Sequence, residues 1–133
     1  MKKLEEKDQY EILVDESKNR IYLSFVGDVK KPEDIPSYNS HVQEAVGSVA
    51  DGYTLMVDIT SNTKAPSFGL TKMLKDSQKT FMSGGVFKTA VVISPKLFLQ
   101  RMTLDVVTKL TGMNLQTFKD RGDAETWLEE TTH

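Results

Sequence analysis

The strongest constraint on the fold is a pair of short, nearly continuous apolar runs that a helical pattern separates. The runs are Tyr53–Ile59 and Lys88–Ser94, and neither leaves a polar face for solvent. Runs of this kind are typical of strands that are covered on both faces, as in parallel sheets. Parallel neighbours need a crossover connection, which is usually a helix. The sequence therefore predicts an α/β fold.

Two further strands are predicted before these runs. Arg20–Val26 alternates apolar and polar residues with period two, which indicates a half-buried strand. Tyr10–Asp15 precedes it, and the polar cluster Asp15–Asn19 between them favours a turn. These segments predict an antiparallel hairpin.

Helical spacing of apolar residues predicts four helices, at about residues 32–50, 68–82, 95–113 and 120–130. A short last strand is expected at 114–118. The order predicts one α/β domain over residues 10–130, with a mixed sheet of about five strands, an N-terminal antiparallel hairpin and four helices. The polar residues 1–9 are expected to form a flexible tail.

Composition mainly excludes chemistries. The chain of 133 residues has no cysteine and two histidines, His41 and His133, so disulfides, thiolate nucleophiles and cysteine-ligated metals are excluded. The 17 Lys and Arg against 19 Asp and Glu give a net charge of −2, which argues against binding to duplex nucleic acid. No secretory signal follows the N-terminus, and no run approaches the roughly 18 apolar residues of a membrane span. We expect a cytoplasmic protein without an integral membrane segment.

The segment after the Tyr53–Ile59 run carries a family resemblance. Asp58 ends this run, and the sequence Pro66-Ser67-Phe68-Gly69-Leu70 follows a polar loop and opens a helix. The arrangement resembles STAS domains of the anti-sigma-factor antagonist type, in which an Asp-Ser-Ser-Gly-Leu motif opens this helix and a partner kinase phosphorylates its first serine. The resemblance implies that Ser67 is the phospho-acceptor, although Pro66 and Phe68 differ from the motif.

The C-terminal third is similar to a divergent STAS-like branch, which is related to the sporulation antagonist and to CRAL-TRIO lipid-binding domains. The segments that carry the similarity are Phe87–Ser94, Leu115–Phe118 and Asp123–Leu128. The resemblance covers about residues 10–130. It implies a bacterial regulatory module, or a carrier of lipid-like molecules.

Two polar residues are ligand-binding candidates with structural alternatives. Ser67 is predicted at a helix N-terminus, where the positive dipole end stabilises an anion or a phosphate group. The alternative is that Ser67 is an ordinary N-cap serine. Asp58 is predicted at the carboxyl end of a central strand, where open α/β sheets bind ligands. The alternative is that Asp58 caps the following loop.

Apolar residues form a third candidate group. Methionine and phenylalanine are frequent after residue 67, and Phe68, Phe98 and Met102 fall where an apolar ligand could lie between the second and third helices. The alternative is ordinary core packing at helical spacing.

The sequence predicts a non-enzymatic binding or regulatory module that acts through a protein partner. The ligand or phospho-serine site is expected at the start of the second helix. No catalytic residue, metal site or cofactor is predicted. The alternative function is a carrier of a lipid-like or small apolar ligand. A homodimer is compatible with either function.

Overall fold

The sheet has six strands whose spatial order equals their order in the chain. The computed structural model describes residues 2–6, 10–26, 36–60, 68–94 and 114–130, with only the backbone described at 6 and 68–74. The strands are β1 (Lys2–Glu6), β2 (Tyr10–Asp15), β3 (Arg20–Phe25), β4 (Thr54–Asp58), β5 (Lys88–Val92) and β6 (Leu115–Phe118). β1, β2 and β3 pair antiparallel, and β3 to β6 pair parallel.

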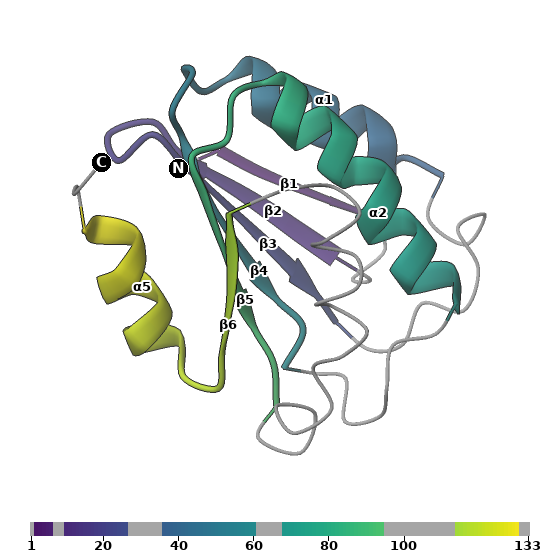
Figure 1. Cartoon of the computed structure of the whole chain (residues 1–133). Helices are drawn as coiled ribbons and strands as arrows, with labels where there is room; N and C mark the ends of the chain where they lie inside the picture. Colours follow the sequence, from purple (N-terminus) through teal and green to yellow (C-terminus); the bar gives the residue numbers. More distant parts are fainter. Residues whose placement is uncertain (1, 7–9, 27–35, 61–67, 95–113, 131–133) are drawn as a thin grey trace.

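Helices cover the two faces of this sheet. α1 (Tyr38–Gly47) and α2 (Phe68–Ser83) lie together on one face, and α5 (Arg121–Glu129) lies on the other (Figure 1). Right-handed crossovers between parallel strands that are added in one direction place their helices on the same face, which explains the position of α1 and α2. α5 follows the last strand, so no crossover constrains it, and it packs on β4, β5 and β6. No described helix combines the length and the apolar composition that crossing a membrane requires.

The α/β class, the mixed sheet and the N-terminal hairpin are confirmed, but the predicted number of strands is wrong. The described residues form six strands and three helices, not five and four. The additional strand is β1, which occupies part of the segment expected to be a flexible tail. It was missed because only Leu4 among its residues is apolar. The predicted helix over 95–113 and the predicted start of the first helix at 32 lie outside the described residues.

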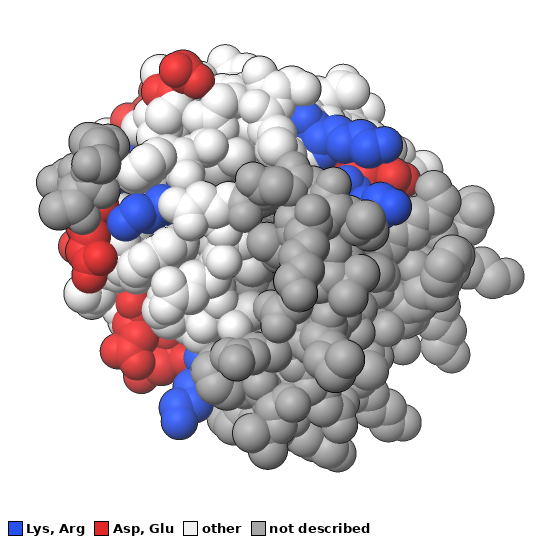
Figure 2. Space-filling model, viewed as in Figure 1, with Lys and Arg blue, Asp and Glu red and all other residues white. Residues whose placement is uncertain are grey.

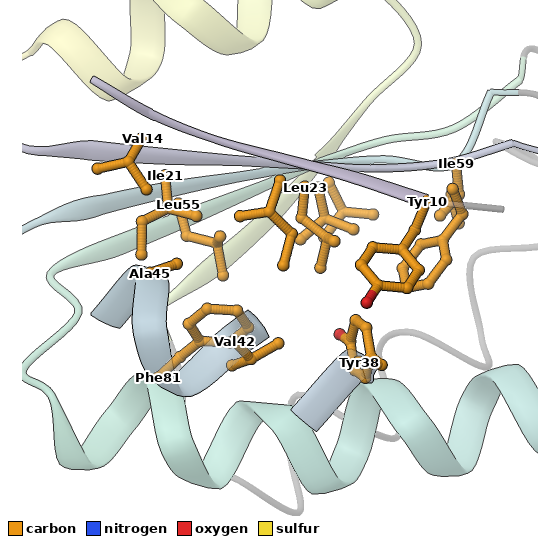
Figure 3. Close-up of a cluster of buried hydrophobic side chains, with 14 of the residues drawn as sticks. Tyr10, Val14, Ile21, Leu23, Tyr38, Val42, Ala45, Leu55, Ile59 and Phe81 are labelled. Carbon is orange, nitrogen blue, oxygen red and sulfur yellow. The ribbon is translucent and has the colours of Figure 1, made fainter. Parts of the chain in front are cut away.

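The larger core lies between the sheet and the helices α1 and α2 (Figure 3). Val14, Ile21, Leu23 and Leu55 project from the strands toward the helices. The other core residues labelled in Figure 3 are Tyr10, Tyr38, Val42, Ala45, Ile59 and Phe81. Every one of these side chains is nearly inaccessible to solvent, so their burial stabilises the docking of both helices.

Aromatic rings and polar groups complete this core at one end. Tyr10 packs edge-on against Tyr38 with ring centroids 5.3 Å apart. The Tyr10 hydroxyl lies 2.5 Å from Nδ1 of the partly buried His41, and the Tyr38 hydroxyl donates to Oγ of Ser77 at 2.9 Å. Each hydroxyl therefore has a hydrogen-bond partner, as buried phenols require.

The smaller core lies under α5 and corrects the prediction for the second hairpin strand. Its members are Tyr22, Met56, Ala90, Val92, Ala124 and Leu128. β3 was expected to expose Arg20 and Tyr22, but α5 covers them and both are buried. β3 is thus covered on both faces rather than half-buried.

Burial of two tyrosines predicts a loss of stability at alkaline pH. Removal from water raises the pKa of Tyr38 and of Tyr53 well above the ordinary value of 10.0. The folded state therefore retains these protons at a pH where the unfolded state has lost them, and the free energy of unfolding falls as the pH rises above about 10. Urea unfolding followed between about pH 8 and pH 11 measures this slope. Replacing both residues with phenylalanine should flatten the profile, and an unchanged slope would contradict this assignment.

Candidate functional site

Asp58 ends β4 at the carboxyl edge of the parallel strands. Its side chain is 17% exposed and both carboxylate oxygens are engaged. Oδ1 accepts hydrogen bonds from the backbone N–H of Thr60 at 2.9 Å and from the Thr60 hydroxyl at 2.6 Å. Oδ2 accepts from Nη1 of Arg121 at 3.1 Å. Asp58 thus both caps the start of the following loop, as the structural alternative predicts, and holds a cation at the edge of the sheet.

Arg121 is the first residue of α5 and reaches this edge because β6 ends beside β5. Its side chain is 48% exposed, and its guanidinium also lies over the ring of Tyr22, at 5.6 Å from the centroid. A guanidinium has five N–H donors, so the contact with Asp58 leaves others directed to solvent. Asp120 accepts a hydrogen bond from the N–H of Gly122 at 2.7 Å and fixes the N-terminus of the same helix. The arrangement holds an accessible cation in a defined orientation.

The other sequence-predicted site residues are not brought to this edge by any described contact. Ser67, Phe98 and Met102 lie outside the described residues. Phe68 opens α2, and only its backbone is described. α2 begins at Phe68, as the helical pattern predicts, and the role of Ser67 stays a prediction.

A buried arginine attaches α5 to the opposite end of the sheet. The side chain of Arg20 is 4% exposed, and its Nη1 lies 2.5 Å from Oε2 of Glu125. Its Nε donates to Oγ1 of Thr54 at 2.8 Å, and Nη1 also donates to the hydroxyl of Tyr22 at 3.4 Å. A charge removed from water is tolerated when it is paired and hydrogen-bonded, which all of these contacts supply.

Lys88 caps the other end of α5. Its Nζ donates to the backbone carbonyl oxygens of Trp127 and Glu130, at 2.9 and 3.0 Å, and lies 4.8 Å from the ring centroid of Trp127. Terminal carbonyl groups of a helix have no partner within the helix, and the negative dipole end favours a cation there. Lys88 therefore has a structural explanation as a C-terminal cap.

A groove of about 460 Å³ opens between these contacts, at the amino ends of β4 and β5. Lys18, Arg20, Thr54, Phe87 and Glu129 are among its lining residues. Its volume suits a small molecule. However, Arg20 is bound to Glu125, and Nζ of Lys18 lies 3.5 Å from Oε1 of Glu129. Both cations are thus paired with carboxylates of α5, so we assign the groove a structural role.

The space between α2 and the sheet is small in the described residues. A cavity of about 20 Å³ lies there, and its lining includes Leu23, Leu55, Gln78, Phe81 and Thr89. Oε1 of Gln78 and Oγ1 of Thr89 are buried there without a hydrogen-bond partner. This volume holds about one water molecule. Of the methionine and phenylalanine residues after residue 67, Phe81 lies in the core, whereas Met82 is 41% exposed.

Surface charge is mixed over the described part of the molecule. Acidic side chains gather over α5 and basic ones over α2 (Figure 2). Lys75 and Lys79 are exposed on α2 beside Asp76, which agrees with a solvated helix face.

Sequence reasoning missed Arg20 and Arg121, for different reasons. The position of Arg121 could have been predicted, because a residue that closely follows the last parallel strand lies near the carboxyl edge of the sheet, where Asp58 ends β4. The role of Arg20 could not, because its alternating position in a strand is typical of an exposed residue, and its partner Glu125 is 105 residues away in the chain.

No protein-family model matches the chain, and no curated protein sequence matches it.

Proposed function

We propose that the chain is a non-enzymatic binding module that acts through a protein partner at the carboxyl edge of its sheet. The observation that supports this proposal is the half-exposed side chain of Arg121, whose Nη1 lies 3.1 Å from Oδ2 of Asp58 at the end of β4. Arginine is enriched in protein interfaces because its planar group forms several directed hydrogen bonds and stacks on rings. An oriented guanidinium loses less side-chain entropy when a partner binds.

In this proposal Ser67 is the regulatory position. A phosphate group directly before α2 would add about two negative charges close to the positive end of the helix dipole. The surface that a partner meets would change its charge while the sheet and the cores remain unaltered. Partner affinity would then depend on phosphorylation.

A carrier of lipid-like or small apolar molecules is the second candidate function. The similarity of the C-terminal third to CRAL-TRIO domains favours it, and so do the candidates Phe68, Phe98 and Met102. The described cavity beneath α2 holds about one water molecule, far less than a pocket for a drug-sized ligand. This cavity is separate from the pocket predicted between the second and third helices. We rank the carrier below the protein-binding module because no contact among the described residues supports it.

Native mass spectrometry of the chain purified from its own cells separates these two functions. The binding module predicts a complex with a second, different protein in a fixed ratio. The carrier predicts a mass increase of a few hundred daltons that is removed by an organic solvent, an order of magnitude typical of a ligand of about 20–40 heavy atoms. Recovery of the apolar adduct without a protein partner would contradict the proposed function.

A further inference from the structure

The outer edge of β1 is available for pairing in the described part of the molecule. β1 is the first strand in the sheet order, and β2 is its single neighbour there. Outside this pairing, no described residue forms a backbone hydrogen bond with β1. The side chains of Lys2, Lys3 and Glu5 are each about half exposed. An edge strand of this kind presents a row of unused N–H and C=O groups that another strand can pair with.

The charges of β1 are complementary to themselves in one arrangement. The sequence Lys2-Lys3-Leu4-Glu5-Glu6 changes from basic to acidic about Leu4. When two copies pair antiparallel with Leu4 opposite Leu4, Lys3 of each copy lies opposite Glu5 of the other. A shift by two residues brings Lys3 opposite Lys3, or Glu5 opposite Glu5, and parallel pairing in register opposes like charges throughout. Opposite charges across a strand pair stabilise it and like charges destabilise it, so the sequence selects one register.

A single copy leaves the charge of Glu5 poorly compensated. Glu5 lies directly opposite Glu11 of β2, and Nζ of Lys3 lies 3.6 Å from Glu5 and 3.2 Å from Glu11. One ammonium group is therefore shared between two carboxylates, and these carboxylates raise the pKa of Lys3. A second copy would place another Lys3 opposite Glu5, on the side away from Glu11, and would offset this repulsion.

The position of Leu4 orients the strand for such pairing. Leu4 is partly buried and packs against the larger core, on the face of the sheet that carries α1. Lys2 lies on the same face and pairs with Glu44 of α1 at 2.9 Å. β1 is thus held in the plane of the sheet, so an added strand would extend the sheet rather than cross it.

We propose that the chain forms a two-fold homodimer in which β1 pairs antiparallel with β1 of a second copy, with Leu4 at the symmetry axis. The two sheets then form one continuous sheet. The helices α1 and α2 of both copies lie on one face of it, and α5 of both copies lies on the other. This surface is the lateral edge of the sheet, so the inference does not depend on the proposed partner site at the carboxyl edge.

Charge reversal tests the register by sedimentation equilibrium over a concentration series. Lys3→Glu and Glu5→Lys each convert both symmetry-related pairs to like charges, and each should raise the dimer dissociation constant about tenfold or more. The double variant K3E/E5K restores opposite charges across the dimer and should recover most of the affinity. Lys79→Glu on α2 is the matched control, because it makes the same charge change as Lys3→Glu far along the chain from β1, and it should leave the dissociation constant unchanged.

Disulfide cross-linking tests the same β1–β1 register independently. The chain has no cysteine, so Leu4→Cys introduces a single thiol. Opposed residues of an antiparallel pair lie about 4.5–5.5 Å apart at Cα, which a disulfide spans. Oxidised glutathione should therefore convert L4C to a covalent dimer much faster than E5C, whose thiol would face Lys3 of the other copy. A monomer throughout the concentration series, equal cross-linking of L4C and E5C, or a double reversal as weak as the single ones would overturn the proposal.

Discussion

Glu125→Leu is expected to lower the free energy of unfolding by about 3 kcal/mol. The substitution removes the carboxylate that lies 2.5 Å from Nη1 of Arg20, and the positive charge stays on a side chain that is 4% exposed. Breaking a buried ion pair on one side costs roughly 3–5 kcal/mol, because the remaining charge stays buried without its partner. Glu125 is 28% exposed and Glu129 lies 3.9 Å from the same nitrogen, which favours the lower end of that range.

Two further variants separate the charge effect from loss of packing. Glu129→Leu removes a 57% exposed carboxylate at a longer distance and should cost less than about 1 kcal/mol. The double variant R20M/E125L removes both charges and should recover most of the stability, because apolar replacements of buried pairs are often neutral. Urea unfolding measures all three. A loss for Glu125→Leu no larger than for Glu129→Leu would contradict the structural role of this pair.

Phe81→Ala is expected to have an effect of similar or greater size, about 3–5 kcal/mol. The ring is 2% exposed, and among the described side chains of α2 it is the one that belongs to the larger core. Its removal leaves a cavity between α2 and the sheet, and the loss combines the transfer free energy of the ring with the cost of that cavity.

Met82→Ala is the matched control for this experiment. Met82 follows Phe81 in the same helix and is 41% exposed, so its truncation should change the free energy of unfolding by less than about 1 kcal/mol. Thermal or urea unfolding of both variants tests the orientation of α2. Equal losses would mean that α2 does not present Phe81 to the core.

The sequence predicts the central strands well because their mostly apolar side chains indicate that both faces are buried. β4 and β5 are apolar on both faces and lie between helices on both faces, so composition alone identifies them. β3 was judged half-buried because Arg20 and Tyr22 are polar in type. Their burial depends on contacts with α5 at the far end of the chain, which no local pattern reveals.

The edge of the sheet was harder to predict for the opposite reason. Among the described side chains of β1, Leu4 is the one that packs against the core, and a single apolar residue is too short a pattern to indicate a strand. Its charges resemble those of a solvated tail, and pairing with β2 determines its structure.

The candidate site shows the same division. The position of Asp58 at the end of a parallel strand was predicted and is confirmed by its place at the end of β4. Its partner Arg121 lies 63 residues later, and the contact follows only from the order of the strands in the sheet. The roles of Ser67, Phe98 and Met102 stay predictions.

The central claim is that a protein partner binds at the carboxyl edge, and the fraction of the chain in complex tests it most directly. Native mass spectrometry of tagged wild type, Arg121→Ala, Ser67→Asp and Lys79→Ala chains, each purified from the cells of origin, measures this fraction. We predict that the wild type and Lys79→Ala carry the same partner in equal amounts. Arg121→Ala should reduce the fraction of the chain in complex at least fivefold, which corresponds to about 1 kcal/mol of binding free energy. Ser67→Asp should clearly change this fraction. Equal partner fractions in all four chains would contradict the account.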